Sequence, residues 1–167
     1  MMTIVIAASV FWHKTMYHFK TVDPGRVYRS GTLSSVGLHL VHALYGIKTI
    51  VNLRSAVEMN EAWYEREEKF AKANGIILIN LPMLPDTPPT EAHIEKFLSV
   101  ATNSAMLPLL VHCEMGVVRT SMLVSVYRIA VMHESNQQAL KKLHMFGRTF
   151  DRRPAVKDFI LSYTPSS

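Results

Sequence analysis

The feature that most constrains the fold of this 167-residue chain is an alternation of short β-branched runs with longer stretches of helical periodicity. The β-branched runs predict three buried strands, at residues 47–53, 76–81 and 107–112. Apolar spacing and capping signals predict helices at residues 35–45, 58–73, 91–102, 119–132 and 136–146, with a last short helix near Pro154. Such alternation is typical of an α/β fold whose central, mostly parallel sheet is flanked by helices on both faces.

Local signals mark where two of these helices begin. Ser55 and Glu58 have the Ser-x-x-Glu spacing of a capping box, which places a helix start near residue 58. Ser135 and Gln138 have the equivalent Ser-x-x-Gln spacing before a later helix. In contrast, residues 23–31, DPGRVYRSG, are rich in turn-forming residues, so we interpret them as a turn-rich connection.

Length and composition predict one folded domain, which we place at residues 21–167. The chain is 49% hydrophobic and 19% charged, the balance of a globular protein. Residues 1–20 form a separate N-terminal segment, in which residues 3–12 are uncharged and mostly apolar. This stretch has about half the length of a membrane-spanning helix, so it fits a signal peptide core, a shortened anchor or a docking arm. Whether the domain is cytoplasmic, exported or anchored depends on that segment, and membrane contact is expected only through residues 3–12.

Charge and cysteine content argue against several kinds of partner and site. The formal net charge is +5, but Lys and Arg are scattered rather than gathered in one stripe, which argues against nucleic-acid binding. The single cysteine permits no internal disulfide and leaves too few thiols for a cysteine-rich metal site. The histidines show no metal-binding spacing with one another or with carboxylates, so no metal site is expected.

The single cysteine, Cys113, stands between the predicted strand at 107–112 and the predicted helix at 119–132. A lone thiol is most often a small buried hydrophobic group. In parallel α/β sheets, however, ligands bind beyond the carboxyl ends of the strands, and Cys113 falls at such an end. Its position therefore favours a reactive thiol over a structural one.

The turn after Cys113 has the composition of an anion-binding site. A tight passage from strand to helix can point successive backbone N–H groups at one spot, and the positive end of the following helix adds to their field. Gly116 supplies the conformational freedom for such a turn, and Arg119 offers a planar fork of donors for two phosphate oxygens. Because an ordinary thiol is only a few per cent ionised at neutral pH, a site built for anions would favour the reactive thiolate.

The stretch HCEMGVVRT, residues 112–120, resembles the His-Cys-x5-Arg-Thr signature of the cysteine-dependent protein tyrosine and dual-specificity phosphatases. The similarity extends to VYRSGTLS at residues 27–34 and to GIKTIVNLRS at residues 46–55. The combination looks most like the small atypical dual-specificity phosphatases of the bacterial and plant type. The resemblance implies the phosphatase (Cys-x5-Arg) fold and hydrolysis of phosphomonoesters through a phosphocysteine intermediate, with no metal or cofactor.

The same resemblance implies roles for the residues of the signature. Cys113 would be the nucleophile and Arg119 the phosphate clamp. Thr120 would place its hydroxyl near the sulfur and ease hydrolysis of the intermediate, and His112 would orient the loop. Many relatives have Gly where this chain has Ser121, a substitution that is benign at a helix start. The backbone cradle for phosphate would consist of Glu114, Met115, Gly116, Val117, Val118 and Arg119.

Expelling the leaving oxygen from phosphorus needs a proton donor, which this family takes from an aspartate on a loop upstream of the signature. Asp86, in LPMLPDTPPT, is the only carboxylate between Glu68 and Glu91, and the neighbouring prolines stiffen its loop. Asp86 is therefore the predicted general acid, and the general base of the second step. The alternative is that Asp86 only begins a turn, in which case Glu91 is the second candidate for the acid.

Arginines outside the signature are interpreted as solvated. Arg54 follows a predicted strand and could face the site, but an arginine at a strand end more often lies in solvent. Arg148, Arg152 and Arg153 form a small basic cluster that could hold acidic flanks of a substrate, although a solvated face is the simpler interpretation.

The partner that the resemblance implies is a phosphorylated protein or peptide. Glu114, Met115, Val117 and Val118 include no lysine, so the extra cations that favour inositol phosphates or phosphoinositides are missing from the loop. This favours phosphotyrosine, with phosphoserine or phosphothreonine as further substrates if the pocket is shallow. The alternatives are a phosphatase of phosphoinositides or inositol phosphates, a phosphate-binding module with little or no turnover, and a sulfurtransferase, which would not need the arginine and the acid.

Overall fold

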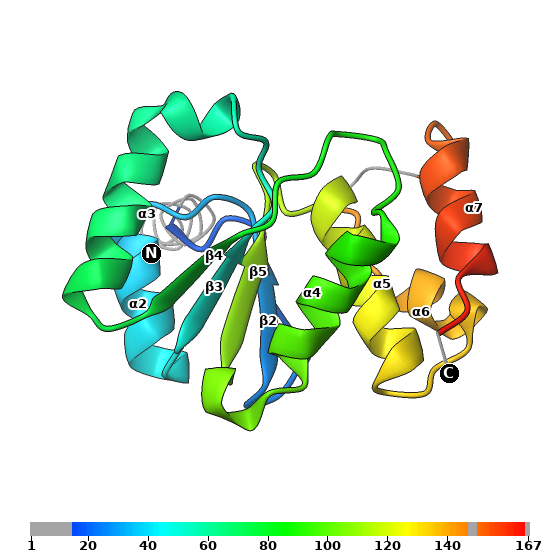
Figure 1. Ribbon diagram of the computed structural model, residues 1–167, viewed down its shortest axis with the longest axis horizontal. Coiled ribbons are helices and arrows are strands. Elements are labelled where there is room, and N and C mark those ends of the chain that lie inside the picture. The colour runs from blue at the N-terminus through cyan, green and yellow to red at the C-terminus, as the bar shows by residue number, and fades with distance from the viewer. Residues whose placement is uncertain (1–14, 147–149, 166–167) are drawn as a thin grey trace, which may run out of the picture.

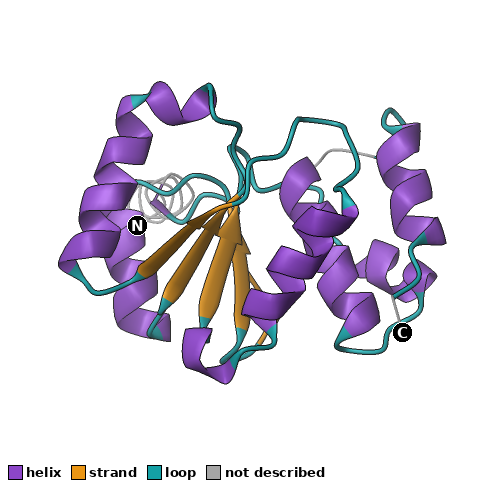
Figure 2. Cartoon of the chain, viewed as in Figure 1, coloured by secondary structure: helices purple, strands orange, loops and turns teal. Residues whose placement is uncertain are grey.

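Five strands form one sheet in the computed structural model, which describes residues 15–146 and 150–165 (Figures 1 and 2). Their order across the sheet is β1–β2–β5–β3–β4; β1 is antiparallel to β2, and the other neighbouring pairs are parallel. The predicted α/β fold with a mostly parallel sheet is confirmed. The strands are β1 Lys20–Asp23, β2 Val27–Ser30, β3 Thr49–Asn52, β4 Ile77–Asn80 and β5 Leu109–His112.

Helices cover both faces of the sheet, as predicted (Figure 1). One face packs against α2 and α3, and the other against α4 and α5, with α6 and α7 beyond α5. Side chains of β5 alternate between the two cores: Leu110 faces α2 and α3, whereas Leu109 and Val111 face the opposite side. The helices are α2 Ser35–Tyr45, α3 Ala62–Ala73, α4 Glu91–Ala101, α5 Val118–Ala130, α6 Asn136–Lys142 and α7 Pro154–Ser162, and the short 3-10 helices are η1 Glu58–Asn60 and η2 Ser104–Met106.

Local hydrogen bonds explain where several helices begin and end. The Ser34 hydroxyl accepts a hydrogen bond from Gly37 N, and Gly46 ends α2 in a left-handed conformation with φ of 63°. The predicted capping box of Ser135 and Gln138 is present at the start of α6. That helix ends at Lys142, four residues before the predicted end at 146, because the backbone of Leu143 is extended.

The first two strands were not predicted from the sequence. Residues 23–31 were interpreted as a turn-rich connection, but the turn occupies only residues 24–26, and the residues on either side form the hairpin of β1 and β2. β2 is fully buried and pairs in parallel with β5. Strands of four residues are too short for their periodicity to be recognised, and a buried arginine in the middle of β2 conceals its apolar character.

Two further expectations are corrected by the structure. The helix predicted at 58–73 begins at Ala62, because Glu61 has an extended backbone and separates α3 from the short η1. The strand predicted to be buried at 76–81 is instead the edge strand β4, whose outward residue Ile77 is 43% exposed.

The N-terminal segment is described only from residue 15 onward. Thr15 and Met16 are buried, and Tyr17 accepts a hydrogen bond from Gly31 N through its carbonyl. The apolar stretch at 3–12 lies outside the described residues, so the expectations of a signal peptide, an anchor or a docking arm stay predictions. Between residues 15 and 165, leaving out 147–149, no helix combines the length and apolar character needed to cross a bilayer.

Candidate active site

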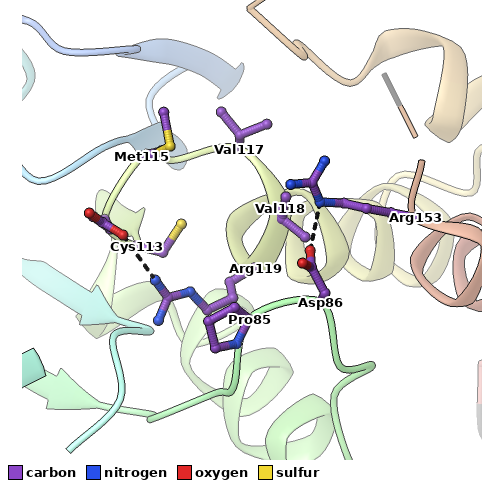
Figure 3. A pocket seen from close by; sticks show the side chains of 9 residues that line it. Pro85, Asp86, Cys113, Met115, Val117, Val118, Arg119 and Arg153 are labelled. Atoms are coloured by element: carbon purple, nitrogen blue, oxygen red, sulfur yellow. Dashed lines mark hydrogen bonds and ion pairs between the residues drawn. The ribbon is translucent and has the colours of Figure 1, made fainter. Parts of the chain in front are cut away.

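Cys113 begins the loop that joins β5 to α5, and we call residues 113–117 the β5–α5 loop. The Cys113 side chain is 3% exposed overall and lies at the floor of a pocket of about 180 Å³ (Figure 3). The pocket brings together the predicted nucleophile, the predicted phosphate clamp and the predicted acid. It is lined by Pro85, Asp86, Cys113, Glu114, Met115, Val117, Val118, Arg119 and Arg153.

Carbonyl groups of the β5–α5 loop are hydrogen-bonded from the side of the N-terminal hairpin. Thr32 donates from its backbone N–H to Glu114 O at 2.9 Å and from its hydroxyl to Cys113 O at 3.3 Å. His18 Nδ1 donates to Met115 O at 2.7 Å. The last two carbonyls of the loop accept from a guanidinium group on β2. The loop therefore directs its carbonyls into the protein.

The backbone N–H groups of the same loop are available to donate hydrogen bonds to a ligand. Within the described ranges, no group accepts a hydrogen bond from the N–H groups of residues 114–117. Because a peptide unit carries its N–H and C=O on opposite sides, carbonyls that turn inward leave amides that turn outward. The result is a concave set of donors at the start of α5, which is the geometry of an anion-binding site.

Gly116 is required by the close approach of this loop to β2. Its φ is 65°, in the left-handed region, and a Cβ atom there would lie 2.1 Å from Ser30 O. Any side chain would therefore collide with the backbone of β2 and adopt a strained conformation. The conformational freedom predicted for Gly116 is used at this contact.

Arg119 is held in place by a carboxylate that was not predicted to belong to the site. Glu58 accepts hydrogen bonds from Arg119 Nη1 at 2.6 Å and from Nη2 at 3.0 Å, a two-point contact. The same carboxylate accepts from Arg54 Nε at 3.0 Å and from the Ser55 hydroxyl at 2.7 Å. Glu58 thus orients the guanidinium that faces the pocket.

The ion pair changes the acidity of Glu58. Burial by itself raises the pKa of Glu58, but hydrogen bonds from Arg119 and Ser55, together with the charge of Arg119, outweigh burial and lower the pKa to about 2. For Arg119, burial alone lowers the pKa, and the hydrogen bond to Glu58 and the charges of Cys113 and Glu58 reverse that effect and raise it. The carboxylate and the guanidinium are therefore both charged at neutral pH.

Replacing Glu58 with glutamine should remove a pH-dependent part of the free energy of unfolding. The pKa of Glu58 is about 2 in the folded protein, below the ordinary value of 4.5. The stabilisation is therefore present above the ordinary value and is lost as the pH falls toward about 2. We expect the difference in free energy of unfolding between wild type and Glu58→Gln to shrink from about pH 5 downward, measured by urea denaturation. A difference that does not change with pH would contradict the assignment.

His112 lies beneath the pocket in a fully buried pair. Its Nε2 is 3.1 Å from the carboxylate of Glu67 on α3, and the two side chains are 1% and 3% exposed. The ring of Trp63 packs edge-on against the imidazole. Because His112 ends β5 directly before Cys113, this contact ties the start of the loop to α3. The role of orienting the loop stays a prediction.

Thr120 and Ser121 lie in the first turn of α5, and both are fully buried. Thr120 Oγ1 has no hydrogen-bond partner among the residues that the structure describes. The Ser121 hydroxyl accepts a hydrogen bond from Arg29 Nη2 at 2.9 Å. The serine at the position where many relatives have glycine therefore takes part in the contacts behind the loop.

Asp86 comes from the loop between β4 and α4 and forms the opposite wall of the pocket (Figure 3). Its backbone has a φ of 57°, and its Oδ1 accepts a hydrogen bond from Arg153 Nε at 2.6 Å. The second candidate acid, Glu91, does not line this pocket and lies at the start of α4 in a groove with Tyr163. Of the two carboxylates, only Asp86 shares a cavity with Cys113.

The structure corrects the expectation that the other arginines are solvated. Arg54 is 5% exposed, donates to Glu58, and stacks on Trp63 with 4.0 Å between the guanidinium carbon and the ring centroid. Arg153 lines the pocket, while Arg152 is exposed. Arg148 lies outside the described residues. Arg153 therefore adds a second guanidinium to the pocket.

Within the described ranges, no group of three or more His, Cys, Asp or Glu side chains could hold a metal ion. The charged groups of the pocket are two guanidinium groups and two carboxylates, from Arg119, Arg153, Asp86 and Glu114. Such a set can bind an anion and can move a proton.

Several residues of the site escaped prediction because their contacts are distant in sequence. Glu58 has the spacing of a capping box, so its carboxylate was interpreted as a local cap, yet it contacts Arg119 as well as Ser55. Glu67 sits in a helix with many charges, and no pattern distinguishes it. The stretch VYRSG at residues 27–31 resembles the family, but the resemblance implies no role for its arginine, Arg29.

Comparisons with known proteins agree with this geometry. Residues 12–157 match the family model described as "DSP-PTPase phosphatase fused to NAD+ Kinase". Over 98 residues, 59% of this chain, the sequence is 31% identical to a protein of Oryza sativa subsp. japonica named "Probable NAD kinase 2, chloroplastic". The match covers 10% of that relative's own length.

Solved structures share the fold over nearly the whole chain. The core catalytic domain of the PP-IP phosphatase SIW14 from S. cerevisiae, solved with citrate, is 25% identical with a TM-score of 0.73, covering 88% of this chain and 85% of that one. TpbA from P. aeruginosa is 21% identical with a TM-score of 0.70, covering 89% and 86%. A variant of TpbA has been solved in complex with pTyr.

The family match extends over most of the chain and includes both walls of the pocket. The chain belongs to the family of DSP-PTPase phosphatase domains, and it has the fold of the cysteine-dependent dual-specificity phosphatases.

Proposed function

We propose that this chain hydrolyses phosphomonoesters through a phosphocysteine on Cys113, and that its substrates are phosphorylated proteins or peptides. The observation that carries the proposal is the pocket in which Cys113, Arg119 and Asp86 meet beneath unpaired loop amides. A module that only binds phosphate needs no acid on the opposite wall. A sulfurtransferase needs neither the acid nor the arginine.

In the first step the Cys113 thiolate attacks phosphorus and forms an S–P bond, while the P–O bond to the leaving group breaks. The loop amides and Arg119 hold the three non-bridging oxygens, whose charge they stabilise. Asp86 donates its proton to the leaving oxygen, so that an alcohol or phenol departs instead of an anion. The position of Asp86 on the wall opposite the loop suits this transfer (Figure 3).

In the second step water attacks phosphorus, the S–P bond breaks and inorganic phosphate leaves. Asp86, now a carboxylate, accepts the proton of the attacking water, and the electron pair of the broken bond returns to sulfur as thiolate. The Thr120 hydroxyl, buried and without a partner among the described residues, is available to stabilise that thiolate. Phosphate is the product, and the Cys113 thiolate and the protonated Asp86 are regenerated.

The walls of the pocket support a phosphotyrosine substrate. The β5–α5 loop contributes no lysine, and its side chains include Met115 and Val117, which suit an aromatic ring. The complex of TpbA with pTyr is consistent with a phosphotyrosine substrate. The second candidate is an inositol phosphate, favoured by Arg153 as a second cation in the pocket and by the name of the PP-IP phosphatase SIW14.

A substrate panel separates the two candidates. We expect kcat/KM for a phosphotyrosine peptide to exceed that for the matching phosphoserine and phosphothreonine peptides and for inositol phosphates, because a single phosphate on an aromatic stem fills the pocket. Phosphate release would be measured for all of them under one set of conditions. A higher kcat/KM for inositol phosphates would overturn the choice of protein substrates while leaving the phosphatase reaction intact.

Arg153→Gln provides the matched variant for this panel. It should lower kcat/KM for an inositol polyphosphate by about tenfold or more, since one charge-assisted contact is lost. For the phosphotyrosine peptide the loss should be smaller. Equal losses on both substrates would mean that Arg153 acts through Asp86 rather than through a second phosphate.

A further inference from the structure

Arg29, in the middle of β2, is buried behind the β5–α5 loop. Its side chain is 1% exposed, and it is the bulkiest of the fully buried residues. Nη2 donates to Gly116 O, to Val117 O at 3.5 Å and to Ser121 Oγ at 2.9 Å. The guanidinium carbon also lies 6.0 Å from the ring centroid of Phe146. Arg29 is not part of the pocket lining.

Among residues 15–146 and 150–165, no carboxylate forms an ion pair with this guanidinium. Among the described residues, none of the ion pairs involves Arg29, and its Nε has no hydrogen-bond partner. Burial of an unpaired charge is unfavourable by several kcal/mol. An anionic group nearby would offset that cost.

The nearby group is the sulfur of Cys113. Burial lowers the pKa of Arg29 to about 10, the negative charge of Cys113 raises it, and the positive charge of Arg128 lowers it further. Arg29 is therefore still cationic at neutral pH. Its field acts on Cys113 from inside the protein, whereas Arg119 acts from the pocket.

The hydrogen bonds of Arg29 also determine which way the loop faces. Gly116 O and Val117 O both accept from Nη2, so the peptide groups that carry these carbonyls direct their amides away from Arg29. Val117 O also accepts from Ser121 N at 3.1 Å, whereas Arg29 is the donor to Gly116 O. Without Arg29 the Gly116 carbonyl would be buried and unsatisfied, or its peptide group would turn. A turned peptide group would present a carbonyl oxygen to an anionic ligand.

We propose that Arg29 is a positioning residue of the active site, which fixes the Gly116 carbonyl of the β5–α5 loop and stabilises the Cys113 thiolate from behind. The contribution of Arg29 to catalysis rests on the proposed function. Its two effects, thiol reactivity and anion binding, can nevertheless be measured without turnover.

Other charged groups also face Cys113 or Arg29, and the variants at Arg29 leave them in place. They are His112, Glu114 and Arg119 around the sulfur, Asp86 and Arg153 across the pocket, and His18, Arg128 and His144 around Arg29 and the loop. Substitutions at Arg29 alone keep this set constant.

Three variants separate the two effects. Arg29→Lys keeps the charge, Arg29→Gln keeps an N–H donor without the charge, and Arg29→Met keeps neither. The rate of alkylation of the single cysteine by iodoacetamide across pH reports the thiolate, and protection by inorganic phosphate reports anion binding. We expect Arg29→Met to react about tenfold more slowly than wild type at a pH about one unit below the midpoint of the wild-type alkylation profile, and to lose phosphate protection. Arg29→Gln should react equally slowly but keep part of the protection.

Arg128→Met is the matched control, because it removes another buried arginine whose partners are Glu134 and Val22 O. Its alkylation rate and phosphate protection should stay within about twofold of wild type.

The proposal would be overturned if Arg29→Met folds, as judged by its urea midpoint, and matches wild type in both readouts. If Arg29→Met does not fold, equal alkylation profiles for Arg29→Lys and Arg29→Gln would overturn the electrostatic part. A wild type that alkylates as expected but hydrolyses no substrate would refute the proposed function alone.

Discussion

Cys113→Ser is expected to bind phosphorylated ligands and to hydrolyse none of them at a measurable rate. A serine hydroxyl is neutral at physiological pH, so the anionic nucleophile is lost while the loop amides and Arg119 remain in place. Loss of the covalent nucleophile lowers kcat by a factor on the order of 10⁶ in a serine hydrolase. Turnover of a chromogenic aryl phosphate and calorimetric binding of a phosphotyrosine peptide would measure the two properties separately.

The same experiment tests the covalent intermediate directly. Because the chain has one cysteine, a thiol phosphate trapped by rapid acid quench of the wild type can be located at Cys113 by peptide mapping. Turnover retained by Cys113→Ser would refute nucleophilic catalysis by this residue. If the wild type binds the peptide but is as inactive as the variant, the chain is a phosphate-binding module.

Asp86→Asn should reduce turnover strongly for substrates with poor leaving groups and only slightly for activated ones. Phenyl phosphate needs a proton on its leaving oxygen, whereas a nitrophenolate departs more easily without one. General acids of this kind contribute about 10²- to 10⁴-fold, so we expect a loss in that range for phenyl phosphate. The slope of log kcat/KM against leaving-group pKa should become steeper in the variant.

Two controls isolate this effect. Arg153→Met removes the partner of Asp86 but leaves the acid in place, so its leaving-group dependence should resemble that of wild type. Glu91→Gln removes the neighbouring carboxylate that does not line the pocket, and its kinetics should not change. A steeper leaving-group dependence in Glu91→Gln would transfer the role of the acid to Glu91.

The alternation of strands and helices and the signature around Cys113 are local patterns, so both could be predicted from the sequence. Parallel strands covered by helices follow from the period and spacing of apolar residues, which is why three of the five strands and the main helices were predicted. The pairing of a cysteine with an arginine six residues later is local too. Both lie in one loop and the helix that follows it.

The remainder of the site depends on contacts between distant parts of the chain. Arg29 interrupts an apolar run, so β2 lacks the signal of a buried strand, and the reason for the arginine is a loop that lies 87 residues further on. Glu58 resembles a helix cap, although η1 ends at once and its carboxylate reaches a residue 61 positions away. No periodicity or spacing encodes such pairs, because they exist only after the sheet has brought their strands together.

The two-point contact between Glu58 and Arg119 also bears on product release in the proposed reaction. An arginine without a counter-ion would hold free orthophosphate tightly, and departure of the product would then limit the cycle. Here the guanidinium already has a permanent negative neighbour, so part of its attraction for a dianion is offset in advance. In the proposed reaction, the site would thereby bind the phosphoryl group during transfer and still release inorganic phosphate afterwards.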